Sequence, residues 1–372
     1  MTDTATQPLI PVLKRRVRAL TYLAGATGFA VLLAAIALMQ RASTGEPAFK
    51  PIRMFANLEK QVEEVAAIQI ETKASSFNVV RDAQGHWTLP DRAKYPADFS
   101  TVRKTILGLA QLDLVAEKTS RADWQEKLGL GLPKSGGAGT LVTLKDGKGE
   151  VLATLVAGAS AEGESAGGRQ AIYVRYPNEP QTYVARGTFS ATTDQVQWLD
   201  KTFVELARDR TKTVAMRPFK GKPYTVTREK PEDANFRIVE AIPAGRQLRT
   251  ETEANGIGNA LLGLSFDDVK PQSLVDFANA ASFGVATFDG LNVVFKIVEK
   301  DRDYWIAVEA AANPAIQTSP AKPGATQLKP DVAKEAKEIN ALVGGWAYKI
   351  PRYKGTLMTA PLEDLLRPIG GG

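Results

Sequence analysis

One short stretch of the chain has the spacing of a serine hydrolase. Residues 163–167 read Gly-Glu-Ser-Ala-Gly, the pattern that exposes a serine nucleophile on a sharp turn between a strand and a helix. The surrounding residues 158–168 are rich in Gly, Ala, Ser and Glu, a composition typical of a loop. The chain's one histidine, His86, precedes Ser165, whereas the hydrolase order places the histidine after the serine. We therefore interpret Ser165 as a loop residue and rank serine hydrolysis last among three functions.

The other residue types exclude several further chemistries. One histidine cannot supply the multi-histidine zinc site of a hydrolase, and we expect His86 to be an exposed turn residue. The lack of cysteine excludes disulfides, thiolate nucleophiles and cysteine-bound metals. Gly256-Ile257-Gly258 lacks the third glycine of a dinucleotide-binding fingerprint, and the chain has no G-x-x-x-x-G-K-[ST] phosphate loop. The sequence thus predicts no catalytic, cofactor-binding or metal-binding residue.

Acidic and tryptophan side chains are the remaining candidates for a site. The acidic pairs lie in charged turns or on surfaces, where we expect solvated charge, and none has the acidic neighbours of a calcium loop. Most tryptophans should be core anchors, and one or two should lie on a partner-binding face. The pairs are Glu63-Glu64, Asp267-Asp268 and Asp301-Arg302-Asp303, and the tryptophans are Trp87, Trp124, Trp198, Trp305 and Trp346.

An uncharged run near the N-terminus predicts a membrane anchor. Leu20–Met39 is long enough, at about 1.5 Å per residue, to cross a hydrocarbon core of about 30 Å. Four basic residues precede it and one follows, so the positive-inside rule predicts a cytoplasmic N-terminus and an exported remainder. The alternative is a signal peptide cleaved after Ala35-Ile36-Ala37, but the run exceeds the usual signal core of about 7–15 residues. We expect a single-pass protein of a bacterial inner membrane whose bulk is periplasmic.

The basic charge is concentrated beside this run. The whole chain has a net charge of +6, and residues 1–41 hold five basic residues against the single acid Asp3. The exported remainder is therefore nearly neutral and lacks the excess of basic residues that is typical of nucleic-acid-binding proteins.

Beyond the anchor, the pattern predicts a mixture of helices and antiparallel strands. Helical spacing of apolar residues predicts helices at Ser100–Leu112, Trp124–Leu128, Thr193–Leu206 and Asp331–Leu342. Apolar and polar residues alternate in several runs bounded by turn residues, which predicts strands around Ile68, Phe77 and Trp87 and a last strand at Trp346–Ile350. The same pattern predicts three hairpins: Thr140–Leu144 with Val151–Val156, Ile172–Tyr176 with Thr182–Ala185, and Val285–Val298 with Tyr304–Val308.

A weak internal repeat relates two parts of the exported chain. Residues 77–81 (FNVVR) match residues 224–228 (YTVTR), and Leu107-Gly108-Leu109 matches Leu262-Gly263-Leu264. Each part reads as two or three strands followed by an amphipathic helix, which favours duplication. Chance resemblance is the alternative, because strand–strand–helix patterns are common.

These features predict an α+β protein in which a single N-terminal transmembrane helix carries two related antiparallel-sheet and helix units. The expected order is a cytoplasmic tail (1–19), the transmembrane helix (20–39), a linker (40–52), a first α+β periplasmic unit (53–211), a second α+β unit (212–310), a flexible loop (311–330) and a C-terminal helix and strand (331–372).

The succession of motifs resembles the bacterial family called domain of unknown function 4340. The motifs are AIQIE, FNVVRDAQGHWTL, EKLGLGLP, TLVTLKDGKGEVLATLVAG, AIYVR and a WLDK segment leading into KTVAM, over roughly residues 53–310. The glycine-rich stretch after TLVTLKDGKGEVLATLVAG departs from the compact turn usual in the family. The resemblance implies proteins encoded beside the ATP-binding, permease and gliding-motility-type auxiliary subunits of an ABC-type transport system, with no catalytic residues to carry over.

The expected function is accordingly non-enzymatic. We expect a membrane-anchored periplasmic accessory or scaffold subunit of an ABC-type complex, with permease and auxiliary membrane subunits as partners and the lipid bilayer contacted through Leu20 to Met39. The alternative is a periplasmic ligand-binding module for a glycan, a peptide or a lipid. No nucleic acid and no cofactor is expected.

Overall fold

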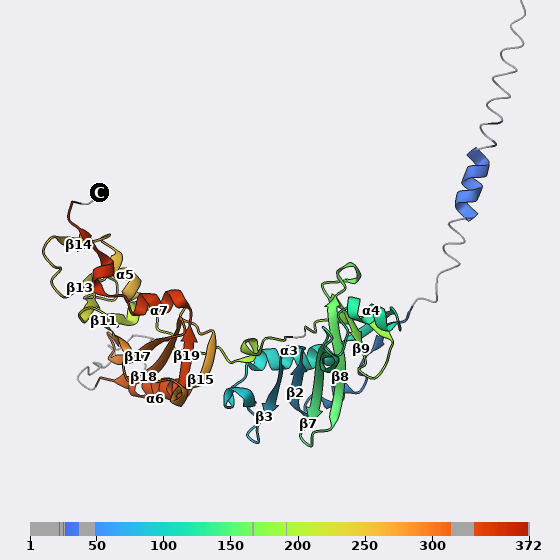
Figure 1. Cartoon of the computed structure of the whole chain (residues 1–372), viewed down its shortest axis with the longest axis horizontal. Helices are drawn as coiled ribbons and strands as arrows, with labels where there is room; N and C mark the ends of the chain where they lie inside the picture. The colour runs from blue at the N-terminus through green and yellow to red at the C-terminus, as the bar shows by residue number, and fades with distance from the viewer. Residues whose placement is uncertain are drawn as a thin grey trace, which may run out of the picture.

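The computed structural model describes two lobes, each built on an antiparallel sheet (Figure 1). The residues it describes are 22, 25, 27–36, 49–165, 167–190, 192–313 and 331–370. Most of the expected linker and of the expected flexible loop lies outside these residues. Within them, no helix is both long enough and apolar enough to cross a membrane. The prediction of an α+β chain with antiparallel sheets is confirmed.

The first lobe is a ten-stranded sheet in the order β1-β6-β10-β9-β8-β7-β2-β3-β4-β5. Alternating apolar residues place one face of its central strands in the core, as in the buried Ile68 and Ile70 of β2. Its strands are β1 (Ile52–Arg53), β2 (Val65–Glu71), β3 (Ser76–Arg81), β4 (Trp87–Leu89), β5 (Tyr95–Pro96), β6 (Asp113–Glu117), β7 (Thr140–Asp146), β8 (Val151–Ser160), β9 (Gln170–Arg175) and β10 (Thr182–Gly187). Its helices are α2 (Leu58–Gln61), α3 (Phe99–Ala110) and α4 (Ala122–Lys127).

Helix α3 covers the first sheet and agrees with the helix predicted at residues 100–112 (Figure 1). The side chain of Asp98 accepts hydrogen bonds from the backbone N–H groups of Ser100 and Thr101, which satisfies donors at the helix start. Val102 and Leu109 form part of its buried stripe. The cap and the apolar spacing together explain why this helix was predictable.

The second lobe is an eight-stranded sheet in the order β13-β12-β11-β16-β17-β18-β19-β15, with a separate β14–β20 pair. Its strands are β11 (Thr211–Arg217), β12 (Tyr224–Thr227), β13 (Arg237–Ile238), β14 (Arg246–Leu248), β15 (Asp268–Pro271), β16 (Ala281–Thr287), β17 (Leu291–Lys300), β18 (Asp303–Ala312), β19 (Trp346–Ile350) and β20 (Leu366–Pro368). Its helices are α5 (Glu253–Gly258), α6 (Val332–Val343) and α7 (Arg352–Met358). Helix α6 and strand β19, expected as a separate C-terminal segment, are part of this lobe, because β19 pairs with both β18 and β15.

The two sheets share one strand order. Read from β4 to β6, the first sheet runs β4-β3-β2-β7-β8-β9-β10-β6, which corresponds strand for strand to β13-β12-β11-β16-β17-β18-β19-β15. The register agrees as well: Ile68 pairs with Val79 in the first lobe, and Val214 pairs with Val226 in the second. This correspondence agrees with the predicted repeat of residues 77–81 in residues 224–228.

The repeat does not extend to the helices as the sequence match implied. Leu107-Gly108-Leu109 lies in α3, but Leu262-Gly263-Leu264 lies in turns after α5, with Gly263 at φ +60°. A left-handed residue cannot continue a right-handed helix, so the second match is coincidental.

Two predicted elements are wrong. Residues 193–206 form only a short 3₁₀ turn, Gln195–Trp198, followed by irregular chain whose Leu199, Val204 and Leu206 are buried in the hydrophobic core. Irregular chain that packs on a core can bury the same spaced apolar residues as an amphipathic helix. The expected strand 285–298 is divided by a turn at Gly290 (φ +95°), where the hydroxyl of Thr287 accepts a hydrogen bond from the N–H of Leu291.

Candidate functional site

Ser165 and His86 lie in unrelated parts of the first lobe. Ser165 ends a short 3₁₀ turn, Glu162–Glu164, and its Oγ accepts a hydrogen bond from the backbone N–H of Ala171 at 3.1 Å. The side chain of His86 is 77% exposed in the β3–β4 turn, 3.6 Å from the carboxylate of Asp82. The strand–serine–helix arrangement of a nucleophile elbow is therefore not formed around Ser165.

Two of the three acidic pairs contain a residue that is held in an ion pair. Asp268 is paired with Arg92 at 2.8 Å, and Asp303 is paired with Lys349 at the same distance. Across the described residues, no group of three or more His, Cys, Asp or Glu side chains is arranged to hold a metal ion.

Four of the five tryptophans pack in or against the core, and one is exposed. Trp87, Trp198 and Trp305 are buried, and Trp346 is half-buried against the core. Trp124, on α4, is 44% exposed, with the ammonium group of Lys127 4.6 Å from its ring centroid. Trp124 is thus the tryptophan whose exposure suits a partner-binding face.

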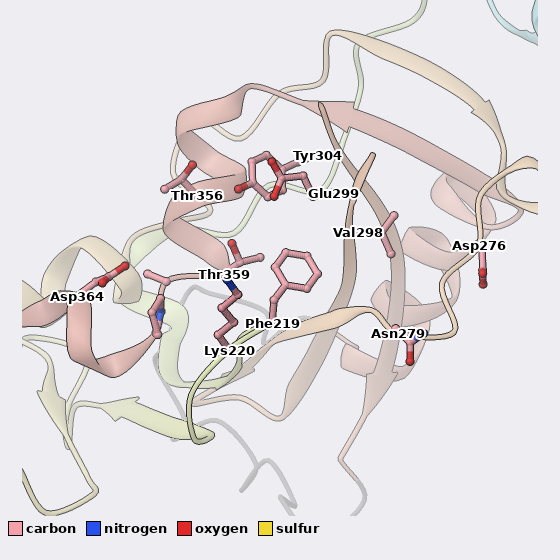
Figure 2. A pocket seen from close by; sticks show the side chains of 12 residues that line it. Phe219, Lys220, Asp276, Asn279, Val298, Glu299, Tyr304, Thr356, Thr359 and Asp364 are labelled. Atoms are coloured by element: carbon pink, nitrogen blue, oxygen red, sulfur yellow. The ribbon is translucent and has the colours of Figure 1, made fainter. Parts of the chain in front are cut away.

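A groove on the second lobe carries both aromatic and charged groups and is a candidate site (Figure 2). It encloses about 760 Å³, within the range of small-molecule pockets. Phe219 and Lys220 reach it from the β11–β12 turn, and Figure 2 shows them beside Thr359, with Tyr304 and Glu299 nearby. The groove therefore combines an exposed aromatic ring with side chains of both charges.

Close backbone contacts set the walls of the groove. A Cβ on Gly355 would lie 2.1 Å from Cγ of Tyr304, so α7 can pack on that ring only with glycine at this position. The Nζ of Lys354 donates hydrogen bonds to the carbonyls of Ala260 and Leu262 at 2.7 and 2.6 Å, and burial lowers the pKa of this ammonium group. These contacts fix α7 against the turn that follows α5.

The opposite wall is held by a buried tyrosine. The Tyr224 hydroxyl on β12 donates to the carbonyl of Ala360 at 2.9 Å, and burial, with smaller contributions from nearby carboxylates, raises its pKa above the ordinary value. Asp276, Glu299 and Asp364 line the groove against the single lysine Lys220, which gives it a negative balance. Such a lining can bind a polar or cationic partner.

The junction between the lobes is the second feature that sequence reasoning missed. Arg92, after β4, donates Nε to Gln195 at 3.0 Å and pairs with Asp268 of the second lobe. The Nζ of Lys201 donates to the carbonyl of Phe266 at 3.0 Å and lies 4.3 Å from its ring centroid. The junction thus joins the first sheet, the connecting chain and the second sheet by specific polar contacts.

Aromatic side chains fill the centre of this junction. Tyr95 of the first lobe lies 5.0 Å from Trp346 and 6.3 Å from Tyr348, both on β19, as measured between ring centroids. Burial raises the pKa of Tyr95 to about 12, and its hydroxyl donates to the carbonyl of Asp200. The alternating aromatics of residues 346–348 were the available sequence signal, but alternation alone does not say which lobe they face.

A family model described as Domain of unknown function (DUF4340) matches residues 87–282, just over half of the chain. The matched segment begins in β4 of the first lobe and ends in β16 of the second, so it includes Arg92, Tyr95 and Asp268 of the junction but not the aromatics of β19. No curated protein and no solved structure matches the chain.

Proposed function

The chain belongs to the domain of unknown function 4340 family, and from this premise we propose that it is a non-enzymatic, membrane-anchored periplasmic scaffold subunit of an ABC-type transport complex. Its N-terminal helix holds it in the inner membrane, with the N-terminus in the cytoplasm. Its two lobes hold the permease and auxiliary membrane subunits in a fixed relation.

Features of the N-terminal segment support the anchor. The described residues 27–36 are helical, and their apolar side chains are exposed instead of packed on either lobe. They belong to the uncharged run Leu20–Met39, which carries four basic residues on one flank and one on the other. Burial of such side chains in lipid is strongly favourable.

The observation that carries the proposal is the junction. A scaffold must keep a constant distance between the surfaces it presents, and an interface with packed aromatics and specific ion pairs resists relative motion better than a bare linker. The segment matched by the family model includes Arg92, Tyr95 and Asp268 of this junction and is not confined to one lobe. A module that acted through one lobe alone would not need it.

A charge exchange across the junction tests this proposal. Asp268→Arg places two cations opposite each other and should reduce co-purification of the permease with the full chain in mild detergent. The double variant Arg92→Asp with Asp268→Arg should restore it, because the ion pair is rebuilt in reverse. Unchanged co-purification in the single variant, or no permease with the wild type, would contradict the proposal.

The second candidate function is a ligand-binding module, and the groove of the second lobe favours it. Thr356 lies on the exposed side of α7 at the groove, so Thr356→Trp should fill the space without disturbing the core. Saturable binding of a glycan, peptide or lipid by the wild type, lost in Thr356→Trp and kept in Tyr353→Trp, would support this function over the scaffold.

A further inference from the structure

A second cavity lies under helix α3 of the first lobe and has a different chemical character. It encloses about 400 Å³ and is lined mainly by apolar side chains. Val62 and Val65 come from the segment after α2, Trp87 comes from β4, and Phe99 and Ile106 come from α3. Phe99 is 63% exposed, so an apolar surface continues from the cavity to solvent.

Two arginines stand at this cavity. Arg81 donates from Nη2 to the carbonyl of Glu63 at 3.0 Å, and its guanidinium lies 6.0 Å from the Trp87 ring centroid. The guanidinium of Arg103, on the next turn of α3 after Phe99, makes no hydrogen bond or ion pair with any part of the chain that the structure describes. Against these two cations the lining holds one carboxylate, that of Glu63. The charge balance at the cavity is therefore positive.

The second lobe shows what the corresponding position looks like when it is closed. Arg228 corresponds to Arg81, because each arginine is the last residue of its matched segment, 224–228 or 77–81. Phe236 corresponds to Trp87, because Trp87 pairs with Arg81 and Phe236 precedes Arg237, the partner of Thr227. Arg228 is 3% exposed and donates to the carbonyls of Thr211, Pro231, Asp233 and Arg208. The guanidinium of Arg81 is exposed and has one such acceptor, so its remaining donors are free for a ligand.

We propose that the cavity under α3 binds an acyl chain that carries an anionic head group. The apolar lining accepts the chain, and burial of its surface drives binding. Arg103 and Arg81 donate charge-assisted hydrogen bonds to the carboxylate or phosphate at the mouth of the cavity. This goes beyond the scaffold function and does not depend on the identity of the transport partners.

Photolabelling of the full chain in phosphatidylcholine nanodiscs tests the proposal. One arm uses a diazirine-bearing palmitate and the other a diazirine-bearing phosphatidylglycerol, which separates a free fatty acid from a membrane lipid as the source. Labelled peptides are mapped by mass spectrometry. Label on residues 62–65 and 99–107, displaced by excess unlabelled palmitate or phosphatidylglycerol, is the expected result.

Matched variants separate the site from the bilayer background. Arg103→Glu should reduce this labelling about tenfold, the effect of about 1.4 kcal/mol, whereas Lys104→Glu makes the same charge change beside the cavity lining and should leave labelling unchanged. A neutral diazirine-bearing hexadecanol should label weakly. Label confined to residues 20–39 in both arms, equal labelling by the neutral probe, or equal loss in both variants would overturn the proposal.

Discussion

The two lobes share one strand order but differ in the burial of the corresponding arginine, Arg81 in the first lobe and Arg228 in the second. In the second lobe, Arg228 is buried beside Phe236 and donates hydrogen bonds to several backbone carbonyls. We call this position of the arginine and the neighbouring aromatic ring the corner of the lobe. In the first lobe, Arg81 donates one hydrogen bond to a backbone carbonyl and borders an open cavity. Sheet order is set by many ladder hydrogen bonds, whereas a corner depends on a few side chains. Two lobes with the same strand order can therefore differ in the side chains at this position.

The largest expected effect is on the closed corner. Arg228→Ala leaves buried carbonyls without donors and should lower the free energy of unfolding by about 3–4 kcal/mol. Arg81→Ala removes one bond from a mostly solvated side chain and should cost less than about 1 kcal/mol. Urea denaturation followed by circular dichroism compares them. Equal losses would show that the two corners are not different in the way described.

The second effect concerns the junction at high pH. Burial holds the pKa of Tyr95 at about 12 against an ordinary 10.0, so the folded state keeps its proton longer than the unfolded state. The stabilising contribution is complete below pH 10 and is lost as the pH rises towards 12, by about 2–3 kcal/mol in total. Urea denaturation across this range should show a steeper decline for the wild type than for Tyr95→Phe. Parallel declines would mean that burial at the junction does not raise the pKa of Tyr95.

The third effect distinguishes two glycines of α5 in the second lobe. A Cβ on Gly258 would lie 2.4 Å from the Phe236 ring, so Gly258→Ala should cost about 1–3 kcal/mol through overpacking. On Gly256 the nearest atom would be 3.6 Å away, and Gly256→Ala should be neutral or stabilise the helix by up to about 1 kcal/mol. Thermal unfolding measures both. A neutral Gly258→Ala would show that the helix can move away from the closed corner.

The smallest effect is expected at Ser165. Ser165→Ala removes one hydrogen bond to the N–H of Ala171 and should lower stability by less than about 1 kcal/mol, without loss of biological activity. Such a result would mean that Ser165 is not a reactive serine that distinguishes the first lobe from the second. Covalent labelling of the wild type by a serine-directed phosphonate, absent in the variant, would instead restore the hydrolase hypothesis.

Sequence reasoning was most successful where the determining contacts are local. The spacing of Val102, Ile106 and Leu109 predicted α3, and the alternation of Trp346–Ile350 predicted β19. It was wrong for residues 193–206, because a helix and an irregular chain packed on a core can bury the same spaced apolar residues.

The candidate sites could not be predicted in the same way. The groove of the second lobe brings together Phe219, Tyr304 and Thr359, which are far apart in sequence and share no motif. The junction depends on Arg92 finding Asp268, a pairing set by the arrangement of both lobes. Spacing along one chain carries no information on contacts of this kind.

The central claim is that the lobes act only when they are held at the membrane. Residues 52–372, exported with a cleavable signal, should fold but fail to complement a deletion of the gene. The same residues joined to an unrelated single transmembrane helix should complement it, because confinement to the membrane raises the effective concentration of the partners. Full complementation by the soluble form at native expression level would contradict the scaffold account.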